Sequence, residues 1–536
     1  IAHIFTYVPN FKVKRTAYDL SYTKQGTFDL GQLIPIMCDE VVPGDVFKIG
    51  AEVVIRPQPL VAPAMVDCDV FLHYFFLPYR ILWTNKNNST GDNPWELFIT
   101  GGVDGPEYDY NLNQWVDNQQ GIPSLPVQQG GTIAPRYSVG DYLGFPNVTV
   151  PNGSPSAPLA FPWYAYNMVY NECYRNENYQ DKVNLNNNVI LNRNYTADYF
   201  TTALPWAQRG SAPRFPIDVN ITIPSTFVDF YDGGSGHMRY DITANTDVDG
   251  DVSLITDSAS LEGKLVVDSQ NVTVDTVTFD INDVRFMSAL QRWQELNART
   301  GVRYVEFLQG HFNVSPSDAR LQRPEFIGGI KTKLIVSEVL QTSPANAQSD
   351  RPLASLGGVG LVADNGYIGK YRAEEYGLIL GLMSVVPKTS YAQGVNRQWL
   401  RKDRTDFYFP EFANLGEQEV YQGELYYTGN GQYGDTADAN TGDFAVFGFQ
   451  QRFSEMKHKQ NIVCADFRDE NGPFAHWHLT RFFDEPQNLG NDFLQVKPED
   501  TKRIFAVQDE KSLIFTVRNL VKAYRPIPKY AIPKID

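Results

Sequence analysis

The chain has 536 residues, a formal net charge of −16 and 13% aromatic residues, together with 41 Gly and 33 Pro. This length exceeds the size at which a single core stops growing, so we expect two to four domains unless one β-rich fold carries long loops. The composition favours the β-rich fold, because aromatic side chains suit pleated sheets while Gly and Pro suit turns. The acidic charge excludes a nucleic-acid-binding coat over the whole surface, although it is compatible with a local basic face.

The four cysteines are scattered and include no CxxC pair, so free thiols are expected rather than a disulfide framework or a zinc site. The first residues carry no secretion-signal pattern, and no apolar run reaches the roughly 18 residues that span a bilayer. We therefore expect a soluble protein of a reducing cytoplasm, without cofactor or membrane insertion.

Residues 1–40 are predicted to form a basic N-terminal arm that contains Lys12, Lys14 and Arg15. Residues 41–210 are expected to form the first part of a β-sandwich. Near-perfect alternation over 41–57 predicts a strand with Phe47, Ile49, Ala51, Val53 and Ile55 on its buried face. A second buried strand is predicted over 66–83, a long loop excursion over about 84–160, a helix beginning at Pro162, and a further strand over 197–210.

Residues 211–279 are predicted to form a separate β-rich surface insertion. Between Asp241 and Thr278 there is no aromatic residue, and eight acidic residues stand against Lys264 alone, a net charge of −7. Short apolar alternations around Asp249-Gly250 and Glu262-Gly263 are typical of hairpins. The composition indicates an excursion into solvent.

Residues 280–536 are expected to complete the sandwich and to end in a basic tail. The segment begins with a helix over about 280–300 that Asp280 can cap. Strands are predicted over 333–343, over 376–387 and twice within 504–530, and the stretch 376–387 is apolar on both faces. Strands near both ends of the chain that must pair favour a Greek-key sandwich.

The stretch from His311 to Thr332 is predicted to be a rigid polar corner. Ser315-Pro316 and Arg323-Pro324 keep the residues before each proline out of the helical region, and Gly328-Gly329 allows backbone angles that other residues avoid. No base or metal ligand set is evident, so ion pairs that fix the loop against a sheet are expected. The candidate residues of this assembly corner are Asp318, Arg320, Arg323 and Glu325.

Three patterns resemble functional motifs but fit ordinary structure better. The run 247–251 lacks the Gly and Glu of a calcium loop, and 358–363 matches a dinucleotide fingerprint without the strand and helix that it needs. His476 and His478 have no evident third metal ligand. The cluster Arg401, Lys402 and Arg404 lies among aromatic residues, as in a surface for single-stranded nucleic acid, although a subunit interface is the more favoured interpretation.

Several segments, in the same order along the chain, resemble the major capsid proteins of the Microviridae, specifically the gokushovirus group. The strongest is SPSDARLQRPEFIGG, and others are LIPIMCDEVVPGDVFKI, FFLPYRILW, YNECYRNEN, GLMSVVPKTSYAQGVNRQW and FGFQQRFSEMKHK. The resemblance implies an all-β fold, a single viral jelly roll of eight antiparallel strands with long loop insertions and a few helices. It implies a structural protein and not an enzyme.

The resemblance also implies partners. Sixty copies are expected to form a small T=1 icosahedral shell around a circular single-stranded DNA genome, with assembly in the cytoplasm of the bacterial host. A small basic DNA-binding protein, a DNA pilot protein and a scaffolding protein of the same phage are expected, as is a bacterial surface receptor. The insertion would form the host-facing protrusion, with Asp247, Asp249, Asp251, Asp257, Glu262 and Asp268 as candidate contacts.

Basic residues near the termini and in the arginine cluster are expected to face the DNA. The candidates are Lys12, Lys14, Arg15, Arg401, Lys402, Arg404, Lys522, Arg525 and Lys529. Joint charge reversal of the last three is predicted to lower DNA packaging more than shell formation. The alternative class is a secreted β-sandwich that binds carbohydrate through its aromatic loops, and particle size separates the two.

Overall fold

The computed structural model consists of two compact units, Gln208–Leu296 and the rest of the chain. It describes residues 15–529 apart from 85–92, 101–106, 110–113, 117–124, 129, 130, 152, 153, 155, 341–355, 434–439 and most of 214–280. The larger unit is built on a nine-stranded antiparallel sheet that folds over into two layers.

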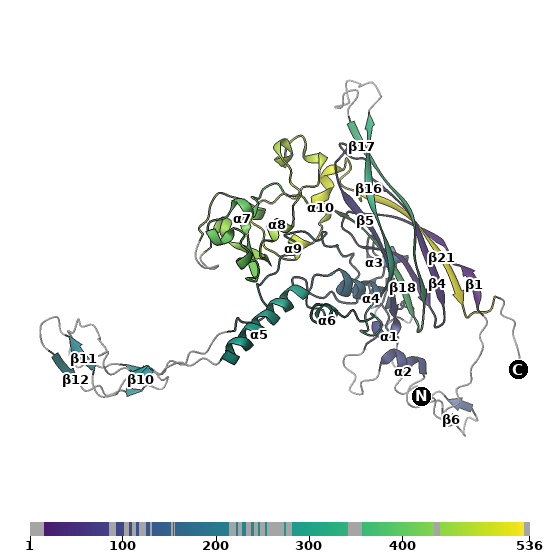
Figure 1. Ribbon diagram of the computed structural model, residues 1–536. Helices are drawn as coiled ribbons and strands as arrows, with labels where there is room; N and C mark the ends of the chain where they lie inside the picture. Colours follow the sequence, from purple (N-terminus) through teal and green to yellow (C-terminus); the bar gives the residue numbers. More distant parts are fainter. Residues whose placement is uncertain are drawn as a thin grey trace. The chain divides into compact units, whose positions relative to one another are not determined.

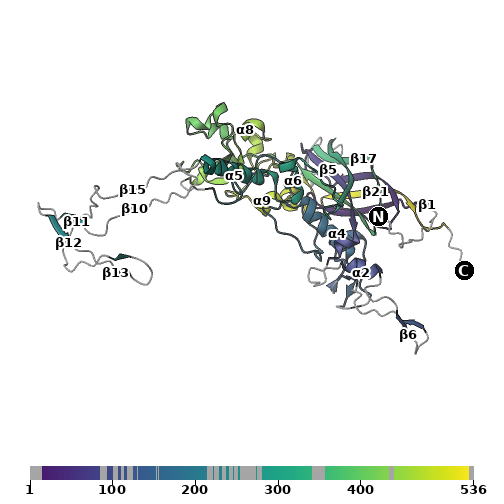
Figure 2. The same ribbon diagram turned by 60° about the horizontal axis from the view of Figure 1, so that its bottom comes forward.

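The first layer contains the strands from the two ends of the chain. Its order is β1 (Thr16–Asp19) and β2 (Tyr22–Phe28), both on β21 (Leu513–Arg525), followed by β4 (Val46–Pro57) and β17 (Leu356–Arg372). In both views β1 in purple lies beside β21 in yellow (Figure 1 and Figure 2). The first strand predicted from the sequence, β4, also pairs with the last strand, β21, so the predicted pairing of first and last strands is confirmed.

The second layer has the order β16 (Glu325–Leu340), β5 (Cys68–Pro78), β18 (Gly377–Pro387) and β3 (Ile34–Val41). One hairpin joins the layers. Residues 325–334 of β16 pair with β5, residues 335–340 pair with 356–361 of β17, and residues 362–372 of β17 pair with β4. The two strands of one hairpin thus separate into opposite layers.

The main core lies between these layers. The buried face predicted for β4 is confirmed, because Phe47, Ile49, Ala51, Val53 and Ile55 are at most 1% exposed. They pack against apolar side chains of β5, β18 and β21, whose alternate residues point into the same space. The two packed antiparallel layers confirm the predicted β-sandwich, whereas the jelly-roll order of its strands stays a prediction.

Helices cover the other face of the second layer. The helix α4 (Phe161–Val169) has Pro162 in its first turn, as predicted, and continues into a π-helix (Tyr170–Tyr174). Trp163 and Tyr166 of α4 pack with Leu380 and other residues of β18. Because β18 is covered on both faces, all of its residues are buried, which confirms the prediction for 377–387, whereas Tyr376 is exposed.

The remaining elements of the larger unit are short. The helices are α1 (Tyr79–Leu82), α2 (Pro94–Thr100), α3 (Val139–Leu143), α6 (Tyr304–Phe312), α7 (Gln422–Leu425), α8 (Ser454–Lys457), α9 (Asn491–Leu494) and α10 (Pro498–Thr501). The strands are β6 (Glu107–Asp109), β7 (Gln114–Val116), β8 (Gly131–Thr132), β9 (Thr149–Val150), β19 (Glu417–Tyr421) and β20 (Val446–Gln451).

Two strand predictions are wrong. Residues 197–210 form turns with a single bridge from Leu204 to Phe449, and the C-terminal region supplies one strand rather than two. Ile504 and Phe505 are buried in the main core, where Phe505 bridges to Leu60 instead of joining a ladder. In both places apolar side chains are buried by loop packing, which local alternation cannot distinguish from strand burial.

The smaller unit contains α5 (Ile281–Thr300 in full extent) and the short paired strands β10 (Ile221–Thr222) with β15 (Thr273–Val274) and β11 (Val228–Tyr231) with β12 (His237–Tyr240). The strands β13 (Asn245–Thr246) and β14 (Val252–Ser253) also pair. They bracket Asp249-Gly250, which confirms that predicted hairpin. The six acidic residues of the predicted protrusion lie outside the described residues.

Candidate nucleic-acid interface

A row of three lysines crosses the exposed face of the first layer. The register places Lys522 of β21 opposite Lys48 of β4, and Lys48 opposite Lys370 of β17. All three side chains are exposed, and none lies within ion-pair distance of a carboxylate in the described part of the chain. We call these residues the lysine row.

The lysine row is electrostatically unfavourable in the isolated subunit. Directly opposed residues on neighbouring strands have Cβ atoms about 5 Å apart, and like charges in such pairs destabilise the sheet. A bound polyanion would relieve this repulsion, because its phosphates supply the missing negative charge. The arrangement therefore favours a site for an anionic partner.

Strand alternation and one β-bulge create the row. Lys48 lies between Phe47 and Ile49 in the sequence. These two side chains point into the core, so Lys48 must point outward. In β17 the register shifts between Tyr367 and Gly369, and this extra residue changes the phase of the strand. Without the bulge Lys370 would face the core.

Further basic and aromatic side chains surround the lysine row. Tyr524 lies beside it, with the Lys48 Nζ atom 5.6 Å from its ring centroid, and Tyr367 is 68% exposed. Arg518 lies on the same face and is 3.6 Å from Glu52 in an exposed ion pair. Cations with exposed rings can hold phosphates while bases stack on the aromatic faces, without reading sequence.

An acidic residue borders the row at β1. Asp19 is opposite Lys522, and its pKa lies below the usual value, mainly because the Ser21 side chain and backbone donate hydrogen bonds to it. Lys522 and Arg518 lower the pKa further through their charges. Asp19 therefore stays ionised and marks the edge of the basic face.

Among the predicted DNA-facing residues near the termini, Lys522 lies in the row, whereas Arg525 has a structural partner. The Arg525 Nη2 atom is 3.0 Å from the Asp45 carboxylate, whose side chain is 0% exposed. Arg525 also donates a 3.2 Å hydrogen bond to the Glu40 carbonyl oxygen. The positive charge of Arg525 therefore stabilises the folded subunit.

The other terminal candidates lie around this face. Arg15 is exposed immediately before β1, and Lys529 is exposed beyond the end of β21. Lys12 and Lys14 lie outside the described residues.

The predicted arginine cluster separates into one structural residue and two exposed ones. Arg401 is 3.4 Å from Glu455, whose side chain is 5% exposed, and its guanidinium lies 5.0 Å from the Phe407 ring centroid. Lys402 is exposed and 5.2 Å from the ring centroid of Phe444, and Arg404 is exposed. The cluster presents two cations rather than three to a partner.

Within the predicted corner, residues 311–332, the loop lies between the end of α6 and Pro324, because Glu325 already belongs to β16. Arg323 is 3.3 Å from Asp318, so this pair fixes the loop internally. Glu325 accepts a 3.2 Å hydrogen bond from the Tyr371 hydroxyl, and burial is the main cause that raises its pKa. Arg320 is exposed.

The two glycines of the corner have a different role from the one predicted. Neither Gly328 nor Gly329 adopts a left-handed conformation. A register shift occurs between Phe326 and Gly328, and a Cβ atom at Gly329 would lie 2.6 Å from the Leu72 carbonyl oxygen. They permit a bulge and a close backbone approach in β16.

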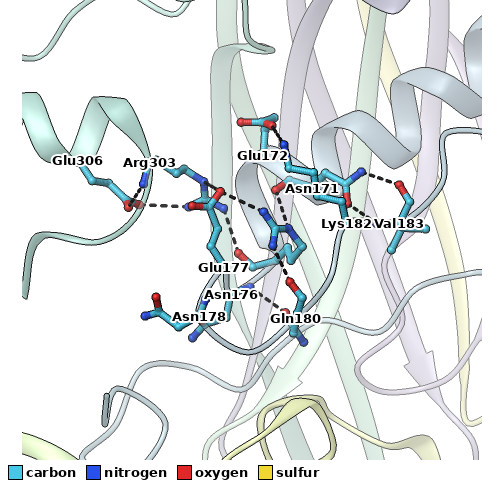
Figure 3. A network of polar contacts seen from close by, with 11 residues as sticks. Asn171, Glu172, Asn176, Glu177, Asn178, Gln180, Lys182, Val183, Arg303 and Glu306 are labelled. Atoms are coloured by element: carbon cyan, nitrogen blue, oxygen red, sulfur yellow. Dashed lines mark hydrogen bonds and ion pairs between the residues drawn. The ribbon is translucent and has the colours of Figure 1, made fainter. Parts of the chain in front are cut away.

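A polar network that the sequence did not indicate anchors the chain where it enters this corner (Figure 3). Arg303 lies 3.0 Å from Glu177 and 3.1 Å from Glu306, and it donates a hydrogen bond to the Arg175 carbonyl oxygen. Arg175 in turn is 3.1 Å from Glu177. Because the contacts that join Arg303 to Arg175 and Glu177 link segments more than 100 residues apart, no local pattern reveals them.

A pocket of about 520 Å³ lies beside this network and is bordered by Glu172, Arg175, Glu177 and Arg303, whose charges already pair within the protein. No group of His, Cys, Asp or Glu in the described residues is arranged to hold a metal ion. His476 instead contacts the Arg503 carbonyl oxygen, and His478 accepts a hydrogen bond from the Thr480 backbone.

Comparison with known proteins shows that nearly the whole chain is similar to capsid proteins. The chain matches the family described as capsid protein (F protein) over residues 6–535. It is 30% identical to capsid protein VP1 of Chlamydia phage 1 and 30% identical to capsid protein VP1 of Bdellovibrio phage phiMH2K, in each case over 99% of this chain and 97% of the relative. Capsid protein VP1 of Spiroplasma virus 4 is 24% identical with the same coverage.

Proposed function

Because the chain belongs to the phage capsid protein (F protein) family, we propose that it is the major capsid protein of a small phage of the Microviridae, with sixty copies in a T=1 shell. The observation that carries this proposal is similarity over 99% of the chain, which includes the strands, the loops and the arginine cluster. The two-layer antiparallel sheet is compatible with a viral jelly roll. The protein's role is structural.

The lysine row is proposed to face the packaged single-stranded DNA. Three opposed cations that form no ion pair within 4.0 Å among the described residues, with Asp19 at the edge and two exposed rings beside them, suit a flexible polyanion better than a protein surface. The set of residues proposed to face the DNA changes accordingly. Lys522 stays, Lys48 and Lys370 join it, and Arg525 is better explained by its ion pair with Asp45.

The variant Lys48→Gln, Lys370→Gln, Lys522→Gln tests this assignment. We expect its purified particles to contain less DNA per shell than wild-type particles. The unassembled subunit should also bind single-stranded DNA with a salt slope smaller by about 2, because each lost phosphate contact contributes roughly 0.7. The triple variant Lys457→Gln, Lys459→Gln, Lys497→Gln makes the same charge change elsewhere and should leave both measurements unchanged. Equal DNA content and slope in the two variants would contradict the assignment.

The capsid role itself is tested by negative-stain imaging and size-exclusion chromatography of the purified chain. Uniform particles in the megadalton range are expected. A monomer or small oligomer under all assembly conditions would contradict the role and would favour the alternative β-sandwich module.

Residues 211–279 are proposed to form the host-facing protrusion. Deletion of Ala244–Thr273 should leave shell formation intact and impair adsorption to the bacterial host. Wild-type adsorption of the deleted particles would contradict the proposal. The proposed partners also include the phage's small basic DNA-binding protein, pilot protein and scaffolding protein, within a virion assembled in the host cytoplasm.

A further inference from the structure

The hairpin that joins the two layers ends in a two-stranded ribbon. Pairing of β16 with β5 stops at Leu334, and pairing of β17 with β4 starts at Val362, so 335–340 and 356–361 form a ladder with each other. Six residue pairs make this ribbon roughly 20 Å long. Figure 1 shows the paired ends of β16 and β17 rising beyond the neighbouring strands.

One face of the ribbon is apolar and exposed. The register places Ile335 opposite Leu361, and Val339 and Val359 lie on the same face. These side chains are 67%, 46%, 48% and 50% exposed, and the other residues of this face are Ser337 and Gly357. We call these four apolar residues and the two small ones the ribbon face.

The ribbon face continues onto the sheet and turns from apolar to basic along it. Val54 of β4 is 37% exposed and lies opposite Ala363, which follows Leu361 on the same side of β17. The lysine row lies at the other end of the same strands. The exposed surface of this layer thus changes from a mainly apolar end, where Arg56 follows Val54 on the outward side of β4, to the cationic end at the lysine row.

The ribbon is packed on its opposite face, where Leu60 bridges to Gly358. Two physical reasons favour a cover for the ribbon face as well. Contiguous exposed apolar patches of more than about a few hundred Å² mark contact sites rather than ordinary surface. The loss of charged residues is also typical of the buried centre of an interface.

We infer that the ribbon face packs against a second copy of this chain. Copies that each carry a net charge of −16 repel one another, so they associate most favourably through surfaces that carry no charge. DNA is a poor occupant, because the ribbon face offers no cation for phosphate. This inference rests on the proposed capsid function, and the ribbon face would be one of the contacts that hold the shell together.

The first test measures access to the ribbon face. In a Cys464→Ser background, which removes the exposed native thiol, the variant Val359→Cys is labelled with a maleimide in dissociated subunits, in empty shells and in DNA-filled particles. We expect labelling to slow by about tenfold or more in both kinds of particle, because contact with a neighbour buries the thiol. The background chain alone serves as the control for the remaining cysteines.

Each other outcome is informative. Equal labelling in subunits and shells would overturn the inference while leaving the capsid function intact, whereas a failure of the wild-type chain to form particles would contradict the proposed function itself. Protection confined to DNA-filled particles would assign the ribbon face to nucleic acid. Slow labelling of dissociated subunits would mean that another segment of the same chain covers it. Both results would overturn the inference.

The second test places a charge on the ribbon face. Val359→Glu should reduce the yield of shells by about tenfold or more, as for truncation of an interface centre, while the conservative Val359→Ile keeps wild-type yield. Subunit folding is checked by circular dichroism and thermal unfolding. Wild-type yield of Val359→Glu shells would overturn the inference.

Discussion

Lys522 and Arg525 are three residues apart in the same strand, yet their charges have opposite consequences. Arg525 is paired with the buried carboxylate of Asp45, whereas Lys522 faces another lysine across the ladder. The first charge stabilises the fold, and the second repels its neighbour until an anion binds. Positive charge in a sequence therefore identifies basic residues but not the cations that remain available to a partner.

Loss of the arginine should have the largest effect. We expect Arg525→Met to lower the free energy of unfolding by about 3–5 kcal/mol, because it leaves the buried Asp45 carboxylate without its cation. Lys522→Met should change it by less than about 0.5 kcal/mol, as for an ordinary surface substitution. Denaturant unfolding of dissociated subunits measures both, and similar values for the two variants would contradict the distinction.

The arginine cluster offers the same contrast on a smaller scale. Arg401→Met should cost about 2–3 kcal/mol, because Glu455 loses a charge-assisted partner and retains Gln418 as a hydrogen-bond donor. Arg404→Met should change stability by at most about 0.5 kcal/mol, because Arg404 is exposed. A larger loss for Arg404→Met than for Arg401→Met would reverse our assignment of these two residues.

Half-buried and exposed histidines should differ in their response to acid. The pKa of His73 is lowered to about 4, mainly by burial and in addition by the charge of Arg193. The folded state therefore holds neutral His73, and the stability present above the unfolded pKa of 6.5 is lost as the pH falls toward 4. Between pH 7 and pH 5 this loss amounts to roughly 2 kcal/mol.

Substitution separates this contribution from the rest of the acid response. His73→Gln should flatten the dependence of unfolding free energy on pH between 7 and 5, apart from any constant loss of packing against Tyr174. His458→Gln is the control, because His458 is exposed. An unchanged slope in His73→Gln would show that His73 does not carry the acid sensitivity.

The smallest predicted effect is a change in stability that has opposite signs for substitutions of two lysines. Lys370→Gln should stabilise the dissociated subunit by about 0.2–0.5 kcal/mol at low salt, because it removes repulsion across the ladder. Lys333→Gln should destabilise it by a similar amount, because Lys333 is 3.3 Å from Asp67. Both effects should fade in high salt, and a common sign would argue against the repulsion in the lysine row.

Local patterns in the sequence determined the buried face of β4, the doubly buried β18, the N-terminal turn of α4 and the hairpin around Asp249-Gly250. Each of these follows from alternation, an uninterrupted apolar run, or the position of Pro or Gly, which act within a few residues. The outward direction of Lys48 could be read from the same alternation, since its neighbours Phe47 and Ile49 are apolar.

The tertiary structure alone decided which charges meet. Arg525 pairs with Asp45, which is about 480 residues away, and Arg401 pairs with Glu455 of α8. The lysine row exists because the register aligns three strands and a bulge changes the phase of β17 before Lys370. Register and ion pairing depend on contacts between distant segments, so the sequence by itself indicated the basic residues, and the fold selected the ones left to bind a partner.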